Sequence, residues 1–242
     1  MLDGIKLIEY DCIGSTNAEA KEYARSAESF EPVVFIAREQ TAGRGRLGRS
    51  FLSRRDRGIY LSVLTFTDGA LSDAVGITTR AAVIVSRAIE EGTGNPMKIK
   101  WVNDIYNHKG KVAGILAESV SVCGRTAVIV GVGINIGDDD FQGELASVAS
   151  SIGQIDECGR EELIESVVNG LIYGYELDYM REYRKRFMLQ DERVELFSAG
   201  ESMGCGTVLG VDDSGGLIFL ADGEQNARII RTGEVSVRKR RQ

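Results

Sequence analysis

Residues 97–136 read MKIKWVNDIYNHKGKVAGILAESVSVCGRTAVIVGVGINI and contain three β-rich runs separated by short polar turns. The runs are MKIKWV (97–102), KVAGILAES (111–119) and TAVIVGVGINI (126–136), and the turns are residues 107–110 and 121–125. Runs rich in Val and Ile that are joined by short turns favour strands that pair with their neighbours along the chain. This stretch therefore predicts an antiparallel meander.

Upstream of the meander, two helices and three strands are predicted, the first of them a short strand before Thr16. The T-x-x-E pattern of Thr16 and Glu19 predicts a capping box that opens an alanine-rich helix over residues 17–27. A second helix is expected from about Ser72 to Glu91, because apolar residues recur there at near-helical spacing and Gly92 to Gly94 follow. The β-rich runs between the two helices predict strands over residues 33–40 and 58–66.

Downstream, the pattern changes from helical to β. A third helical region is expected from about residue 160 to 187, with one apolar stripe formed by Leu163, Ile164, Val167, Val168, Leu171, Ile172 and Tyr175. From Arg193 onward the chain has short strands broken by turns, a spacing that suits a small β-barrel. We therefore predict a domain boundary near Leu189, with domains over residues 1–189 and 190–242.

Composition excludes several classes of protein. The chain has 242 residues, 43 % of them hydrophobic, which is enough for one large domain or a medium domain plus a small one. A net charge of −7 argues against a protein that binds nucleic acid by neutralising phosphates, and the basic run 238–241 is expected to be a solvated tail. No run approaches the ~18 apolar residues of a membrane helix, so we expect a cytoplasmic protein without a membrane segment.

The cysteines and the histidine exclude further kinds of metal, redox and catalytic site. The four cysteines are far apart and form no CxxC pair, which predicts reduced thiols rather than a zinc site or a redox dithiol. The chain has one histidine, His108, so neither a Ser-His-Asp triad nor a multi-histidine metal site is expected. His108 lies in the predicted turn 107–110 and is expected to be exposed.

Residues 41–49, TAGRGRLGR, contain the spacing Gly43-x-Gly45-x-x-Gly48 of a dinucleotide-binding loop. That motif requires a helix at its last glycine, whereas residues 49–57 are polar and lead into another strand. The segment instead predicts an anion-binding loop, because glycines allow close backbone approach and guanidinium groups match phosphate or carboxylate oxygens. The arginines concerned are Arg44, Arg46 and Arg49, with Arg54, Arg55 and Arg57 just behind; the alternative is a solvated basic loop.

A second polar segment, Lys100-Trp101-Val102-Asn103-Asp104, ends a predicted strand, and Lys111 follows across the turn. An antiparallel pair places such residues on one surface, where the lysine and the aspartate could also form a simple cross-strand ion pair. Glycines interrupt the next two strands at positions 114, 131 and 133. A glycine inside a strand often indicates that another group approaches the backbone closely.

Taken together and in this order, these pieces resemble the biotin–protein ligase family. The matching segments are Gly14-Ser15-Thr16-Asn17, residues 39–46 (EQTAGRGR), Lys100-Trp101-x-Asn103-Asp104, Lys111-x-x-Gly114-Ile115-Leu116 and Gly131-x-Gly133-Ile134-Asn135. The sequence departs from the family at Val102, where proline is common, and at Ser50-Phe51, where Lys/Arg-Trp is common. Phe51 keeps an aromatic face, so altered affinity rather than lost activity is expected.

The resemblance implies an α+β fold: a mixed, mainly antiparallel sheet with helices, similar to class II synthetases, followed by a small C-terminal SH3-like β-barrel. It also implies activation of biotin with ATP and Mg²⁺ to biotinyl-5′-AMP, and transfer of biotin to a lysine of a carrier protein such as that of acetyl-CoA carboxylase. Long family members carry an N-terminal DNA-binding domain, and because the motifs begin at Gly14 we expect a short form without one. No nucleic-acid or membrane partner is expected, and a homodimer through sheet edges is implied by the resemblance alone.

Residue roles follow from the matched motifs. The resemblance assigns biotin binding to Ser15, Thr16, Asn17, Gln40, Gly43, Arg44, Arg46, Lys111 and Gly114. It assigns ATP and adenylate binding to Arg46, Arg49, Phe51, Lys100, Trp101, Asn103 and Asn135. Lys111, Arg44 and Asp104 are the predicted catalytic residues, and Asp104 is also the candidate Mg²⁺ ligand or the group that orients the carrier lysine. Thr16 is thus predicted both to cap a helix and to bind biotin.

Two alternatives remain at this point. A lipoate or octanoate ligase has a similar fold and also acylates a carrier lysine. A non-catalytic module could use the arginine loop to bind an anionic partner or RNA, and it would show salt-sensitive binding without ATP turnover.

Overall fold

The computed structural model describes residues 4–68, 74–174, 178–198, 200–231 and 235–239. The chain up to Asn135 contributes all strands of a seven-stranded sheet with the strand order β1-β2-β3-β7-β6-β5-β4. Its strands are β1 (Lys6–Tyr10), β2 (Val33–Ala37), β3 (Gly58–Asp68), β4 (Lys98–Lys100), β5 (Asp104–Tyr106), β6 (Lys111–Val122) and β7 (Arg125–Asn135). Only β1 and β2 pair in parallel, so the sheet is mixed and mainly antiparallel, as expected.

The predicted meander forms the β4-to-β7 half of this sheet. Strands β6 and β7 pair along their length, with Gly114 opposite Gly133 and Leu116 opposite Gly131. One detail differs from the prediction: the first run, MKIKWV, ends at Lys100, and a separate short strand, β5, follows a turn over Trp101 to Asn103. The chain turns there because the Asn103 amide donates to Ile115 O at 2.8 Å, which closes the loop onto β6.

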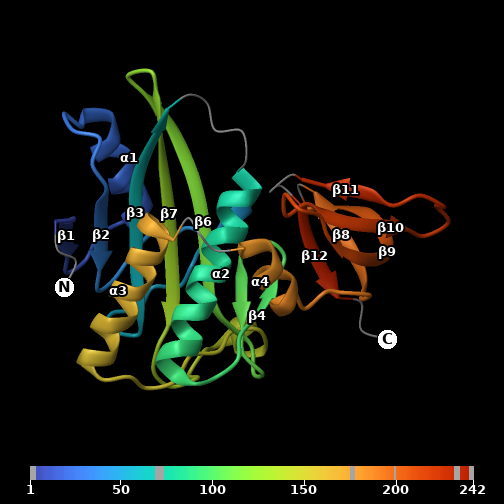
Figure 1. Ribbon diagram of the computed structural model, residues 1–242. Coiled ribbons are helices and arrows are strands. Elements are labelled where there is room, and N and C mark those ends of the chain that lie inside the picture. The colour runs from blue at the N-terminus through green and yellow to red at the C-terminus, as the bar shows by residue number, and fades with distance from the viewer. Residues whose placement is uncertain (1–3, 69–73, 175–177, 199, 232–234, 240–242) are drawn as a thin grey trace.

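Helices cover both faces of the sheet (Figure 1). Helix α1 (Thr16–Ser26) lies on one face, and α2 (Ala74–Thr93) and α3 (Glu157–Tyr173) lie on the other. Alternation along β2 shows the division: Val33 and Phe35 belong to the small core beneath α1, whereas Val34 and Ile36 belong to the large core beneath α2 and α3. Strict alternation of side chains in a strand allows two cores to be built from one apolar run.

Two helix predictions need correction. The capping box is wrong: Ser15 is the N-cap of α1, its side chain makes no capping bond, and Thr16 is the first helical residue, with its N–H donating to Gln40 Oε1 at 2.9 Å. The third helical region is two helices, α3 and α4 (Tyr179–Arg186), where Asp178 caps α4 by accepting from the Arg181 N–H. Among residues of the predicted stripe, Leu163, Val167, Val168 and Ile172 are buried, and Tyr175 lies outside the described residues. Ser72, the expected start of α2, also lies outside them.

The C-terminal part forms a second, five-stranded antiparallel sheet with the order β11-β10-β9-β8-β12. Its strands are β8 (Arg193–Ser198), β9 (Glu201–Val211), β10 (Leu217–Ala221), β11 (Arg228–Ile230) and β12 (Val235–Lys239). No pairing joins β11 to β12 within the described ranges, so the predicted small barrel is open on this side. The α+β class is confirmed, and Figure 1 shows the second sheet beside α4, away from α1.

The predictions for His108, the cysteines and the glycine loop are confirmed. His108 is exposed in the turn between β5 and β6, and all four cysteines are free thiols. The Gly43–Gly48 spacing opens no α-helix, because a single 3₁₀ turn over Arg46–Gly48 is followed by extended chain. Over the stretches that the structure describes, the helices lack the length and apolar character that crossing a membrane would need.

Candidate active site

A cavity of about 830 Å³ lies against strands β6 and β7 beneath the glycine loop. Two sets of polar residues line it. The cationic group consists of Arg46, Arg49, Lys100 and Lys111, and the neutral group consists of Ser15, Thr16, Asn17 and Gln40. Of the other predicted site residues, the lining includes Arg44, Phe51, Trp101, Asn103, Asp104 and Gly114. Segments far apart in the sequence therefore meet at one surface.

The glycine loop folds back on itself above this cavity. The Gly45 N–H donates to Arg49 O at 2.7 Å, and the Phe51 N–H donates to Gly43 O at 2.9 Å, which makes a tight hairpin. Leu47 at its tip has φ 57° and is 45 % exposed, and the next residue, Gly48, also has a positive φ. Two successive left-handed residues turn the chain so that Arg46 and Arg49 both face the cavity.

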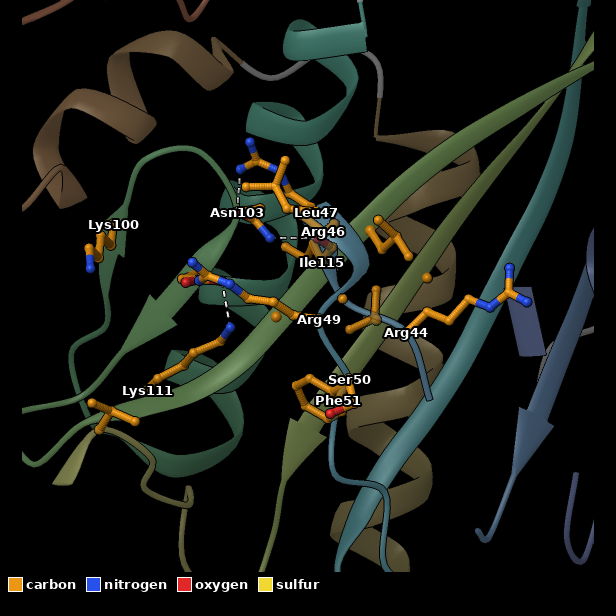
Figure 2. A pocket seen from close by; sticks show the side chains of 18 of the residues that line it. Arg44, Arg46, Leu47, Arg49, Ser50, Phe51, Lys100, Asn103, Lys111 and Ile115 are labelled. Atoms are coloured by element: carbon orange, nitrogen blue, oxygen red, sulfur yellow. Dashed lines mark hydrogen bonds and ion pairs between the residues drawn. The ribbon is translucent and has the colours of Figure 1, made fainter. Parts of the chain in front are cut away.

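Arg46 is fixed by a side-chain hydrogen bond. Its guanidinium donates to Asn103 Oδ1 at 2.7 Å, and the other end of the Asn103 amide is held by Ile115 O (Figure 2). Burial lowers the pKa of Arg46, and the nearby Asp104 carboxylate partly opposes that shift. An arginine so placed stays charged, because its unperturbed pKa lies far above neutrality. The KWxND segment thus orients a cation toward the cavity.

Lys111 and Asp104 form the cross-strand ion pair considered in the sequence, with Nζ and Oδ1 2.6 Å apart. Both side chains are also part of the cavity wall and are between a quarter and a third exposed. An ion pair with this exposure contributes little to stability. It does hold the amine at the cavity wall, and in Figure 2 the Arg49 and Lys111 side chains extend toward the same part of the cavity.

The other arginines are placed differently. Arg44 is exposed at the rim, and Figure 2 shows its side chain pointing away from Lys111. The three arginines behind the loop do not line the cavity and are used in surface ion pairs, which corrects the prediction that they reinforce the anion-binding loop. Arg54 and Arg57 pair with Asp140 at 2.6 and 2.8 Å, and Arg55 pairs with Asp11.

The glycines at positions 114, 131 and 133 of β6 and β7 leave space that the side chains of Phe51 and Asn17 occupy. A Cβ at Gly133 would lie 2.5 Å from the Phe51 ring, and one at Gly114 would lie 3.3 Å from both the ring and Lys111 Nζ. A Cβ at Gly131 would lie 2.1 Å from Asn17 Oδ1. The prediction of close approach is confirmed, and the approaching groups are Phe51, which forms part of the cavity wall, and Asn17.

Three members of the neutral group, Thr16, Asn17 and Gln40, are held by hydrogen bonds. Gln40 accepts from the Thr16 N–H and donates through Nε2 to Ser53 Oγ at 2.9 Å, which fixes the direction of its amide. Asn17 donates to Glu118 Oε2 at 2.8 Å, and Ser62 Oγ lies 2.7 Å from Thr16 Oγ1. Ser53, Ser62 and Glu118 were not selected from the sequence. The signal for Ser62 was one hydroxyl residue inside the apolar run 58–66.

Two predicted site residues, Gly43 and Asn135, do not line the cavity, and a third, Trp101, lines it and also contacts the C-terminal sheet. Gly43 is packed beneath Phe51 O, and the Asn135 amide donates to Ser150 O at 2.9 Å, behind the wall. Trp101 is buried and its indole N–H donates to Gly215 O of the C-terminal sheet at 2.9 Å. Residues Leu145, Val148 and Val237 add apolar lining that the motifs did not indicate.

The fold and the cavity define an α+β ligand-binding protein whose cavity wall carries both cations and neutral hydrogen-bonding groups. A sequence profile described as the biotin/lipoate A/B protein ligase family matches residues 9–135. The chain belongs to this family and is a ligase. The resemblance found in the sequence motifs is therefore confirmed.

Individual relatives agree with this assignment. The bifunctional ligase/repressor BirA of Bacillus spizizenii is 31 % identical over 251 residues, which covers 97 % of this chain and 74 % of that protein. The biotin–[acetyl-CoA-carboxylase] ligase of Mycobacterium tuberculosis is 39 % identical over 131 residues, covering 51 % of this chain and 46 % of that protein. The solved biotin protein ligase of Aquifex aeolicus in complex with biotin and ATP has a TM-score of 0.78 and 25 % identity, covering 97 % of this chain and 99 % of the other.

Proposed function

We propose that this protein condenses biotin with ATP to form biotinyl-5′-AMP and pyrophosphate, and then transfers the biotinyl group to a lysine of a biotin carrier protein. The single observation that carries this proposal is that one cavity brings together Arg46, Arg49 and Lys111 with the fixed amide of Gln40 and the hydroxyls of Ser15 and Thr16. The M. tuberculosis relative is named for the acetyl-CoA carboxylase, which suggests the carrier domain of such a carboxylase as the protein substrate.

The cations address the electrostatic difficulty of the first step. A carboxylate must attack the α-phosphate of ATP, and both groups are anionic. Their repulsion grows in a water-poor cavity, and preorganised positive charge offsets it as charge develops in the transition state. We assign this role to Arg46 and Lys111. Arg44 stands at the rim in this structure, so its predicted catalytic role would require its side chain to turn inward.

The neutral group suits an uncharged, polar head group. The biotin ureido ring has N–H donors and a carbonyl acceptor but no charge, so its recognition needs directional hydrogen bonds rather than ions. Ser15, Thr16 and Gln40 are the residues that we assign to it. Asn17 supports them from behind, because its carbonyl and its amide nitrogen are both already bonded within the protein.

The nucleotide is assigned to the other part of the wall. Arg49 and Lys100 would meet the phosphates, and Phe51 would offer an aromatic face. Asn103 and Trp101 keep the turn between β4 and β5 in shape through their bonds to Arg46 and Gly215. Asn135 supports the wall from outside the lining.

Magnesium fits the donor chemistry of the wall. Mg²⁺ is usually bound by one or two carboxylates together with substrate phosphates, and the lining offers the carboxylates of Asp104 and Glu144. Asp104 is the residue that would hold the ion, and the ion would supply positive charge to the phosphate oxygens. The same carboxylate could instead orient the carrier lysine in the second step.

The division into a catalytic domain of residues 1–189 and a small domain of residues 190–242 is part of this proposal. It is supported by the two separate sheets, between which the chain passes after α4.

The proposal is tested by incubating the protein with biotin, ATP, Mg²⁺ and a biotin carrier domain. We expect a mass gain of one biotinyl group on one carrier lysine, together with pyrophosphate release. The family profile covers ligases of biotin and of lipoate, so the same assay with labelled lipoate and octanoate is required. Modification by lipoate in preference to biotin would overturn the assignment, and RNA binding without ATP turnover would indicate a non-catalytic module.

A further inference from the structure

A chain of buried hydrogen-bonding groups runs from α1 through β3 to β6 behind the neutral group of the cavity. It links Glu118, Asn17, Ser62 and Thr16, and the last three are 0–4 % exposed. Ser62 does not line the cavity, so it acts on a ligand only through its two bonded neighbours in the wall, Thr16 and Asn17. Buried polar groups of this kind must all be satisfied, and this requirement determines the direction of each hydrogen bond.

The direction is set at Glu118. One of its carboxylate oxygens is paired with Lys21, and the other accepts from Asn17 Nδ2 at 2.8 Å. The same nitrogen also donates to Leu116 O at 3.2 Å. A carboxylate and a carbonyl only accept, so the Asn17 amide cannot be turned around without placing three oxygens against one another. Asn17 therefore directs its Oδ1 at Ser62.

The hydroxyls follow from this orientation. Ser62 Oγ lies 2.6 Å from Asn17 Oδ1 and 2.7 Å from Thr16 Oγ1, and it has one hydrogen to donate. Because Asn17 Oδ1 is an acceptor only, the Ser62 hydrogen goes to it, and the short contact with Thr16 requires that Thr16 donate to Ser62. Gln40 Oε1, at 3.2 Å from Thr16 Oγ1, already accepts from the Thr16 N–H. Thr16 thus turns its hydrogen away from the cavity and its lone pairs toward it.

We propose that Glu118, Asn17 and Ser62 form a polarity relay that makes the Thr16 hydroxyl a fixed hydrogen-bond acceptor for an N–H group of the ligand. This inference rests on the proposed function, in which the ligand is a cyclic urea with N–H donors. The relay disfavours acids that lack such a donor, for example the dithiolane of lipoate, because the desolvated lone pair then has no partner. Ser62 and Glu118 act through Thr16 and are positioning residues for substrate selection.

The sharpest test is Glu118→Gln, which keeps the size of the side chain. Lys21 holds the oxygen of the new amide, so its NH₂ faces Asn17 Nδ2. Asn17 must then either keep the two amide nitrogens in contact or turn and set its own oxygen against Leu116 O. Either outcome loosens the hold of Asn17 Oδ1 on the Ser62 hydrogen. Ser62 can then donate to Thr16 and occupy one of its lone pairs, which leaves the Thr16 hydroxyl a poorer acceptor for an N–H donor. We expect KM for biotin to rise about tenfold, the effect of roughly one good hydrogen bond, with kcat and KM for ATP within about twofold of wild type. Glu22→Gln, an exposed residue of α1 with a side chain 74 % exposed, is the matched control.

Two further measurements distinguish the loss of the oriented Thr16 hydrogen bond from a general distortion of the site. Desthiobiotin retains the urea ring of biotin and lacks its second ring. Glu118→Gln should therefore raise the dissociation constants of biotin and desthiobiotin, measured by calorimetry without ATP, by the same factor. Ser62→Ala should show the same selective loss. Unchanged biotin KM in Glu118→Gln, or an equal loss toward ATP, would overturn the relay. Wild-type protein that does not bind biotin at all would instead overturn the proposed function, and that result is obtained before any variant is compared.

Discussion

Among single residues, Lys111 offers the most direct test of the cavity's chemistry. Its amine lies 2.6 Å from Asp104 and belongs to the cationic group. We expect Lys111→Ala to lower the rate of pyrophosphate release from biotin and ATP by more than about tenfold, because removal of one preorganised charge costs a few kcal/mol of transition-state stabilisation. The melting temperature should be almost unchanged, because an exposed ion pair adds little to the stability of the fold. Lys109→Ala is the control, because Lys109 is close in sequence, exposed and outside the cavity. Near-normal release from Lys111→Ala would mean that Lys111 is only a surface ion pair.

Gly133 determines where Phe51 can lie. An added Cβ would meet the ring at 2.5 Å, and a ring edge can move more easily than backbone. We expect Gly133→Ala to push Phe51 into the cavity and raise KM for ATP about tenfold, with a loss of roughly 1 kcal/mol in the free energy of unfolding. The double variant with Phe51→Ala should relieve the clash, so its KM should not exceed that of Phe51→Ala alone. Additive effects of the two substitutions would show that the two positions act independently.

Among the elements, helix α4 is attached to α2 through Arg186, which is the centre of two ion pairs. Arg186 donates to Glu182 at 2.7 Å and also pairs with Glu90 of α2 at 2.5 Å, and only 13 % of its side chain is exposed. Hydrogen bonds from Lys185 and Arg186 lower the pKa of Glu182 from its usual 4.5 to about 2. A carboxylate with a depressed pKa stabilises the folded state above pH 4.5 and loses that contribution as the pH falls toward 2.

Melting temperatures measured from pH 7 to pH 3 test this contribution. The wild type should lose stability below pH 4.5, and Glu182→Gln should start lower and show a smaller further loss over the same range. Glu91→Gln, which removes a carboxylate 63 % exposed on α2, should follow the wild-type slope. Parallel curves for wild type and Glu182→Gln would show that the Glu182 carboxylate does not link α4 stability to pH.

The elements also show what the sequence could and could not predict. The meander was predictable because its signals are local: β-branched runs and two tight turns. The start of α1 was not, since Thr16 meets Gln40 and Ser62, which are 24 and 46 residues away, and these bonds replace the capping box. The break between α3 and α4 was missed because apolar spacing continued through it. In the site, motifs identified the cations, whereas Ser53, Ser62 and Glu118 required the packed sheet to reveal their contacts.

At the scale of the whole molecule, the two sheets are joined beside the site. The Trp101 indole donates to Gly215 O at 2.9 Å, and a Cβ at Gly215 would lie 2.8 Å from Thr79 of α2, so the 212–216 turn is closely packed on the first part of the chain. Val237 of the second sheet also contributes to the cavity wall. The turn between β4 and β5 is therefore bonded both to Arg46 of the cavity wall and to the C-terminal sheet.

This link leads to the last prediction. Trp101→Phe keeps a ring in the core but leaves the buried Gly215 carbonyl without its donor. The cost is about 1–3 kcal/mol, which corresponds to roughly 2–12 °C in melting temperature for a chain of this size. We expect faster proteolytic cleavage between the two sheets, near residue 190, and a raised KM for ATP. Tyr183→Phe is the matched control, because it removes a 3.3 Å bond to Val102 O of the same turn without touching the second sheet. Cleavage at the wild-type rate in Trp101→Phe would show that packing alone, and not this hydrogen bond, holds the C-terminal sheet against the active site.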